Sequence, residues 1–211
     1  MPRSPAAGPV VAAFDADGTL TTRDCVTPFL RRAAGRRLWT TLLVHPLALV
    51  ASVARRDRDR LKELACRALR GLASAQIDTL GTAFAREIVA GRLRADTVAR
   101  LRRHRELGHT VILASASLDP YLAPLGELLG ADGVVCTILE RGADGRLTGR
   151  LVGRNCRGAE KARRVREWLD EAGLADAELW AYGDSDGDAE LLALADHALR
   201  VDGIHVAPEP Q

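Results

Sequence analysis

The sequence has no paired cysteines of the kind that hold zinc or form a disulfide framework. Its four cysteines, Cys25, Cys66, Cys136 and Cys156, are widely spaced, and none belongs to a C-x-x-C pair. This spacing predicts reduced thiols in a cytoplasmic protein. The sequence also has no apolar stretch of signal-peptide length before its first expected strand, and we expect residues 1–9 to form a short mobile tail.

The sequence also lacks a large excess of charge of either sign. Thirty Lys and Arg residues stand against 28 Asp and Glu, giving a net charge of +2, so nucleic acid is not the expected partner. Hydrophobic residues make up 47% and charged residues 27%, as in an ordinary globular protein. A chain of 211 residues can form one principal domain with a smaller accessory unit, as a monomer or a homodimer.

One uncharged segment, Leu38 to Ala54, lies between pairs of arginines at 36–37 and 55–56. Its 17 residues would barely cross a hydrocarbon core of ~30 Å, and Pro46 interrupts them, which disfavours a transmembrane span. Two alternatives remain: a helical hairpin buried in the accessory unit, or a surface that contacts an anionic membrane. Burial is the favoured interpretation.

Short apolar segments alternate with amphipathic ones along the chain. Val10–Phe14, Val111–Ala114 and Leu179–Tyr182 each run into polar or acidic residues, as buried parallel strands do. This alternation predicts an α/β fold with a Rossmann-like, doubly wound parallel sheet. The other expected elements are helices at Ala95–Leu107, Pro120–Leu129 and Ala159–Ala172, strands at Gly133–Thr137 and His197–Val201, and a hairpin over Ile138–Val152.

Residues 27–92 differ from the rest of the chain because their apolar positions follow helical spacing and show no strand alternation. They predict a helical insertion directly after the first acidic loop. The expected division is an α/β core of residues 1–20 and 93–211, with a small α-helical cap of residues 21–92.

Polar side chains follow the expected strands. Asp15 and Asp17 come after the first, Ser115 after the second, and Asp184 and Asp188 after the third. Because the carboxyl ends of parallel strands share a crevice, these groups should gather there. Four carboxylates would repel one another without a cation, and oxygen ligands suit Mg²⁺.

Such a site fits phosphoryl transfer. A carboxylate can attack phosphorus as a nucleophile, and Asp17 is placed to act as general acid and base. Lys161, at the opening of a helix, can supply a fixed positive charge, while Ser115 and the backbone of Ala116 can bind phosphate oxygens. Ser117 is better placed than Ser115 to cap the following helix.

Four motifs stand in order along the chain: DADGT at residues 15–19, VILAS ending at Ser115, Lys161, and GDSDGD at residues 183–188. They resemble those of the haloacid dehalogenase superfamily. The resemblance implies a metal-dependent enzyme whose DADGT motif also includes Gly18 and Thr19. It implies that Asp15 is the nucleophile and a Mg²⁺ ligand, Asp17 the acid/base and a ligand through its carbonyl, Asp184 a further ligand, and Asp188 a partner of Lys161 or of the metal shell.

An acid at the position of Asp17 goes with phosphatases and phosphomutases of this superfamily, and the helical insertion is similar to the cap of its phosphoserine-phosphatase-like branch. The implied function is hydrolysis of a small phosphomonoester, such as an amino acid or alcohol phosphate. Asp24 stands where that branch recognises the substrate amine, but Gly187 replaces its usual asparagine and residues 57–72 contain no phenylalanine, so phosphoserine is not favoured.

Three alternatives to this function remain. The apolar segment is similar to that of phosphatidylglycerophosphate phosphatases, which makes a lipid or amphiphilic phosphate at a membrane surface the first of them. The others are a phosphomutase and a non-catalytic module that binds phosphorylated ligands.

Overall fold

The structure is a computed structural model that describes residues 8–55 and 57–201, so most of the tail expected at residues 1–9 lies outside the described residues. Its centre is a five-stranded sheet in the order β3-β2-β1-β6-β7, and all the neighbouring strands are parallel. These strands are β1 (Val10–Phe14), β2 (Thr110–Leu118), β3 (Gly133–Thr137), β6 (Glu178–Gly183) and β7 (His197–Arg200). The predicted α/β fold is confirmed.

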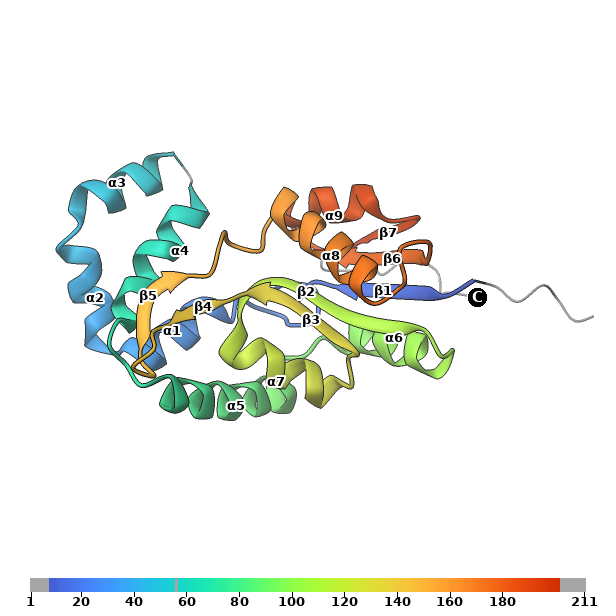
Figure 1. Cartoon of the computed structure of the whole chain (residues 1–211), viewed down its shortest axis with the longest axis horizontal. Helices are drawn as coiled ribbons and strands as arrows, with labels where there is room; N and C mark the ends of the chain where they lie inside the picture. Colours follow the sequence, from blue (N-terminus) through green and yellow to red (C-terminus); the bar gives the residue numbers. More distant parts are fainter. Residues whose placement is uncertain (1–7, 56, 202–211) are drawn as a thin grey trace, which may run out of the picture.

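Helices cover both faces of this sheet (Figure 1). One face is covered by α6 (Ala95–Glu106) and α7 (Asp119–Leu129), and the other by α8 (Ala159–Glu171) and α9 (Ala189–Leu194). The chain adds β2 and β3 on one side of β1 and then β6 and β7 on the other. Because the strand order reverses beside β1, a ligand crevice is expected at the carboxyl end of that strand.

Side chains of the central strands alternate between the two layers of the core. Phe14 and Leu113 pack in the cluster formed with α6 and α7, whereas Ala13 and Ile112 pack in the cluster formed with α8 and α9. Both faces of the sheet are therefore apolar, which explains why its strands read as continuous hydrophobic runs.

The insertion after β1 is helical, as expected from its spacing. It comprises α1 (Val26–Ala34), α2 (Arg36–Leu43), α3 (Pro46–Ala54), α4 (Arg58–Cys66) and α5 (Ser74–Gly91), with a short 3-10 turn between the last two. Pro46 occupies the first turn of α3, where its missing N–H costs no helical hydrogen bond.

The last helix of the insertion, α5, packs against α7 of the core. The rings of Phe84 and Tyr121 meet edge to face at 5.4 Å. Gly81 permits a close approach, because a Cβ there would lie 1.9 Å from the carbonyl oxygen of Pro120. The division at residue 92 between cap and core remains a prediction, and α5 is the helix that joins the two.

The expected hairpin consists of β4 (Leu139–Arg141) and β5 (Leu147–Leu151), which pair antiparallel. It reaches the insertion through three backbone hydrogen bonds. Gly71 N–H donates to the carbonyl of Leu147 at 2.8 Å, Leu147 N–H to that of Leu72 at 2.9 Å, and Ser74 N–H to that of Gly145 at 2.9 Å. The hairpin is thus a second connection between the sheet and the helical insertion.

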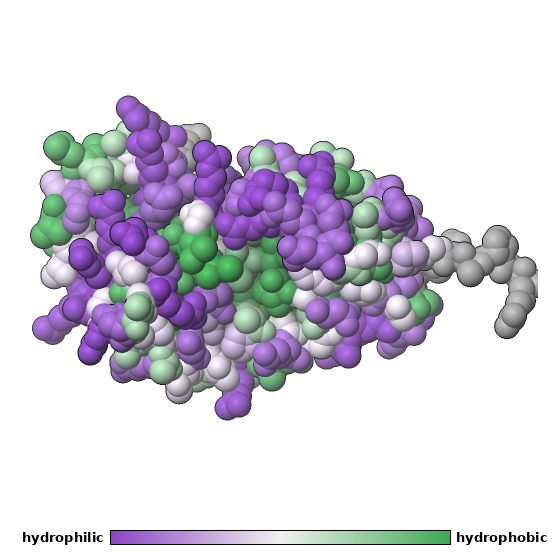
Figure 2. Space-filling view, in the orientation of Figure 1, coloured by the Kyte–Doolittle hydropathy of each residue, from purple (hydrophilic) through white to green (hydrophobic). Residues whose placement is uncertain are grey.

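The interpretation of Leu38–Ala54 as a buried hairpin is wrong. Only Leu38 and Ser52 of this segment are buried, and six of its large apolar side chains are exposed over α2 and α3, at the left edge of Figure 2. The axes of α2 and α3 differ in direction by 87°, so their apolar side chains point in several directions. The one neighbouring helix, α4, cannot cover them all. Within residues 8–55 and 57–201 no single helix could cross a bilayer, although this bent pair has the length and composition to do so.

Candidate active site

Asp15 lies at the carboxyl end of β1, where its N–H donates to the carbonyl of Tyr182 on β6 at 2.9 Å. Its Oδ1 accepts a hydrogen bond from Lys161 Nζ at 2.8 Å, and the same ammonium group contacts Asp188 Oδ1. All three side chains are buried. The structure thus brings together three residues that the sequence motifs place on separate segments.

The two carboxylates and the lysine determine one another's ionisation. Burial alone would lower the pKa of Lys161, but the charges of Asp15 and Asp188 outweigh it and raise this pKa above its usual range. Burial raises the pKa of Asp15 to about 6, against the opposing effect of Lys161. The lysine is therefore a fixed positive charge beside the carboxyl that would attack a phosphate.

Asp188 is held in place by Ser185, which precedes it in a 3-10 turn. The Oδ2 of Asp188 accepts hydrogen bonds from the Ser185 hydroxyl at 2.9 Å and its N–H at 3.1 Å. Its other oxygen is left to face Lys161. Asp188 therefore connects the loop after β6 with the first turn of α8.

Asp17 is held by two donors that come from different parts of the chain. Its Oδ1 accepts from Cys25 N–H and its Oδ2 from the Ser117 hydroxyl, each at 3.0 Å. Burial, followed by the charges of Asp15 and Asp24, raises the pKa of Asp17 to about 7. A carboxyl with this pKa can give and take a proton near neutral pH.

The expectation that Ser117 caps a helix is wrong, because its hydroxyl bonds Asp17 and no side chain caps the start of α7. The strand β2 also continues past Ser115 to Leu118, with a register shift against β3 after Ala114. Ser115 and Ser117 both face this edge of the sheet, and the Ser117 N–H donates to the Ser115 hydroxyl at 3.2 Å. Sequence reasoning missed Ser117 because only the three-dimensional fold brings it to Asp17.

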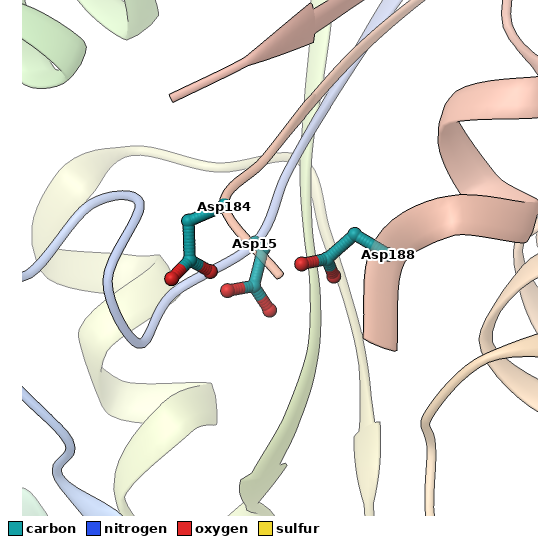
Figure 3. A group of neighbouring side chains, drawn as sticks. All are labelled: Asp15, Asp184 and Asp188. Atoms are coloured by element: carbon teal, nitrogen blue, oxygen red, sulfur yellow. The ribbon is translucent and has the colours of Figure 1, made fainter. Parts of the chain in front are cut away.

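Asp184, after β6, faces Asp15 and Asp188 (Figure 3). One oxygen from each of these three carboxylates lies within 4.8 Å of the others. Asp184 Oδ1 is buried and has no hydrogen-bond partner among the described residues. Carboxylate oxygens that converge in this way suit a hard divalent cation.

Gly18 closes this side of the site. Its φ is +87°, and a Cβ there would lie 2.2 Å from Asp184 Oδ2, so only glycine fits. The next residue, Thr19, is buried, and its carbonyl accepts from Thr97 at the start of α6 at 2.7 Å. These two residues position the loop and its aspartates without themselves carrying charge.

Lys62 reaches the crevice from the helical insertion, and nothing in the sequence pattern marked it. Its Nζ contacts the carbonyl of Ala116 and donates to Asn155 Oδ1 at 2.9 Å, while the Asn155 amide donates to Asp59 at 2.6 Å. Burial lowers the pKa of Lys62. Helix α4 is therefore bonded to the core across the crevice.

The crevice has a volume of about 530 Å³. Its lining includes the four aspartates at positions 15, 17, 184 and 188, both lysines described above, and also Asp24, Arg58 and Arg157. Asp24 has a second role, because its carboxylate accepts from the N–H groups of Val26 and Thr27 at 3.0 and 3.2 Å and so caps α1. Its recognition of a substrate amine stays a prediction.

The model of the haloacid dehalogenase-like hydrolase family matches residues 12–193 of this chain. The chain belongs to that family. Protein CicA of Caulobacter vibrioides is 42% identical over 189 residues, covering 89% of this chain and 84% of CicA. The match confirms the predicted superfamily, and membership of a hydrolase family supports the prediction of an enzyme.

Two solved structures share the fold. A Bordetella pertussis protein of unknown function has a TM-score of 0.68 at 25% identity, covering 89% of this chain and 87% of its own. A phospho-aspartyl intermediate analogue of phosphoserine phosphatase has a TM-score of 0.61 at 17% identity, covering 89% and 84%. The second likeness places the fold with that of the phosphoserine-phosphatase-like branch.

Proposed function

We propose that this protein is a Mg²⁺-dependent phosphomonoester hydrolase that acts through an aspartyl-phosphate on Asp15. The observation that carries the proposal is the buried arrangement of Asp15 with Lys161 and Asp188, beside an Asp184 oxygen that has no partner among the described residues. A nucleophile, a fixed cation and a place for a metal ion are the parts that phosphoryl transfer requires.

The carboxylates of Asp15 and Asp184, with the backbone carbonyl of Asp17, would hold Mg²⁺. The side chain of Asp17 is engaged by Cys25 and Ser117, which is consistent with a role for its carbonyl in metal binding. When bound, the ion supplies positive charge that neutralises the phosphate oxygens. Asp188 is bonded to Lys161 and to Ser185, and so serves better as a support than as a ligand.

The reaction proceeds in two displacements. An oxygen of Asp15 attacks phosphorus while the bond from phosphorus to the leaving oxygen breaks, and Asp17 donates its proton to that oxygen. Asp17, now a carboxylate, takes a proton from a water molecule that attacks the same phosphorus, which releases phosphate and restores Asp15. The pKa of about 7 at Asp17 suits both proton transfers.

Three groups would bind the transferred phosphate: the hydroxyl of Ser115, the backbone N–H of Ala116 and the ammonium of Lys161. Both Ser115 and Ala116 line the crevice beside Lys161. Fixed donors of this kind stabilise charge on the equatorial oxygens without reorganisation during the reaction.

The proposed substrate is a small phosphomonoester, such as an amino acid or alcohol phosphate. A crevice of about 530 Å³ accommodates a molecule of that size, and its lining carries both Asp24 and the cations Arg58, Lys62 and Arg157. This mixed charge is compatible with a zwitterionic substrate. A lipid or amphiphilic phosphate is the second candidate, favoured by the exposed apolar side chains of α2 and α3.

The test is Mg²⁺-dependent release of phosphate from an aryl phosphate, followed by a screen of metabolite phosphates. Asp15→Asn should lower kcat on the order of 10⁴-fold or more, because the nucleophile is lost. Asp186→Asn is the matched control, since Asp186 belongs to the same GDSDGD motif but its side chain is 90% exposed. If the wild type releases no phosphate, a binding module is favoured, and if Asp15→Asn matches the wild type, the mechanism is wrong.

A further inference from the structure

The helices α2 and α3 form a corner at one end of the molecule, at the left of Figure 1. Six large apolar side chains project from it with exposed fractions between 53% and 85%, and we call these residues the apolar corner. They are Trp39, Leu43, Val44, Leu47, Val50 and Val53.

These six residues lie within 15 positions of the chain. The other exposed large apolar residues in the described part of the chain, Val89, Leu128, Ile138 and Val152, come from different elements and are at most 48% exposed. Isolated apolar side chains on a surface are ordinary, whereas a concentrated group marks a surface that meets another apolar phase.

The polar side chains of the same segment are bonded to their own helices. The hydroxyl of Ser52 donates to the carbonyl of Ala48 at 2.7 Å, and Nδ1 of His45 lies 3.0 Å from that of Thr41. Since these groups already have partners, moving the segment out of water would leave few polar atoms unsatisfied.

The segment that forms the corner carries charge of one sign, although Asp57 follows it directly and its Arg32 pairs with Glu87 at 2.7 Å. Residues 25–56 include six arginines and no acidic residue. Arg36, Arg37 and Arg55 are exposed at the ends of the two helices, and the guanidinium of Arg31 lies 5.5 Å from the centre of the Trp39 ring. An apolar centre with a cationic rim is complementary to a bilayer with anionic headgroups.

We propose that the apolar corner docks this protein onto an anionic lipid bilayer. Leu43, Val44, Leu47 and Val50 enter the boundary between headgroups and acyl chains, while the arginines remain among the headgroups. The helices lie at the surface, because α2 has 8 residues and α3 has 9, giving lengths of about 12 and 14 Å, well short of a hydrocarbon core of ~30 Å.

A second copy of the chain fits this surface less well. In a two-fold dimer the same surface meets itself, so the arginines that surround one corner would face those of the other. Residues 25–56 offer no acidic side chain to such a contact, and the nearest along the chain are Asp57 and Asp59 at the start of α4. Lipid headgroups supply the missing negative charge.

Flotation with vesicles tests the proposal on the full chain. We expect the protein to float with vesicles of phosphatidylcholine mixed with phosphatidylglycerol and to bind pure phosphatidylcholine far less, with binding that weakens as salt is added. The double variant Leu47→Glu, Val50→Glu should weaken binding by about tenfold or more, because charges would enter the acyl boundary.

Two further variants separate the contribution of charge to membrane binding from that of the apolar side chains. Arg36→Glu with Arg37→Glu should weaken binding to anionic vesicles by about tenfold and remove most of the salt dependence. Leu128→Glu is the matched control, since Leu128 is an exposed apolar residue of α7, and it should float as the wild type does.

Docking does not depend on the proposed hydrolysis. Leu47→Glu, Val50→Glu should hydrolyse an aryl phosphate in solution at the wild-type rate, so loss of flotation and loss of activity are separate results. The proposal is overturned if anionic lipid gives no more binding than pure phosphatidylcholine, or if the double variant floats like the wild type. It is also overturned if the chain is a dimer without lipid that this variant dissociates, because the corner would then join two copies.

Discussion

The crevice and the apolar corner each reverse the usual distribution of side chains. The crevice buries charged groups, with Asp15 5% exposed and Lys161 and Asp188 each 1%, whereas Leu47 of the corner is 85% exposed. The buried charges satisfy one another through hydrogen bonds within the protein. The six apolar side chains of the corner instead remain exposed to solvent, which favours a partner outside the chain, whereas the protein part of the crevice is already complete.

The largest effect on stability is expected at the centre of the crevice. Lys161→Met should lower the free energy of unfolding by ~3–5 kcal/mol in the absence of Mg²⁺, because it leaves two buried carboxylates facing each other. Urea denaturation measures the change. Arg163→Met, which removes an exposed ion-pairing residue of the same helix, should change it far less, because water screens that pair. Equal stability of the two variants would contradict the internal compensation of the buried charges.

A second buried group makes the core sensitive to acid. His104 of α6 is buried against the sheet, with its ring nitrogens 2.8 Å from Tyr182 Oη and from Nδ1 of His109. Burial lowers its pKa to about 4. As pH falls, His104 takes up a proton in the unfolded chain first, because its pKa there is near 6.5. The stability that neutral His104 contributes to the folded state is therefore present above pH ~6.5 and is lost as pH falls toward 4. Between pH ~6.5 and ~4, the free energy of unfolding of His104→Gln should therefore fall by ~2–3 kcal/mol less than that of the wild type.

The raised pKa values of Asp15 and Asp17 act in the opposite direction, since the folded state then binds more protons than the unfolded one. The effect of His104 must therefore be taken as the difference between variant and wild type, by denaturation at each pH. Parallel pH profiles for the two proteins would show that His104 makes no contribution.

Ser117 should have a smaller effect, on catalysis. Ser117→Ala removes the hydroxyl that positions Asp17 and should lower kcat by about 5- to 30-fold, the value of one hydrogen bond, with KM nearly unchanged. The loss should be greater for an alkyl phosphate than for a nitrophenyl phosphate, because the poorer leaving group needs the proton of Asp17 more.

Thr79→Ala, on the exposed face of α5, is the control and should keep the wild-type kcat. A purely structural role for Ser117 would give the same loss with both leaving groups.

The smallest effect is expected at the apolar corner. Leu47→Ser should change the free energy of unfolding by less than ~0.5 kcal/mol, because this exposed side chain packs against little of the protein. The fully buried Leu118→Ala should cost ~2–5 kcal/mol. Thermal or urea unfolding compares them, and a large loss at Leu47 would mean that the corner packs against the protein after all.

Short-range patterns in the sequence are enough to identify most of the core. Val10–Phe14 and Gly133–Thr137 are strands with the expected bounds, because a continuous apolar run between polar residues is what a sheet buried on both faces requires. The motif residues Asp15, Lys161 and Asp188 could be named because each lies at the end of a strand or the start of a helix. The same patterns could not say that Ser117 supports Asp17, which lies 100 residues away.

The sequence by itself determined the order of strands and helices, the family, and the aspartates and lysine of the crevice, since each element and each motif is a short run of neighbouring residues. The tertiary structure decided what depends on packing between distant segments. It brings Lys62 of α4 to Asn155, 93 residues later, and it leaves the segment around Leu47 exposed where burial was expected. Hydrophobicity gives the tendency of a side chain to leave water, but only the arrangement of neighbouring helices decides whether that side chain is buried.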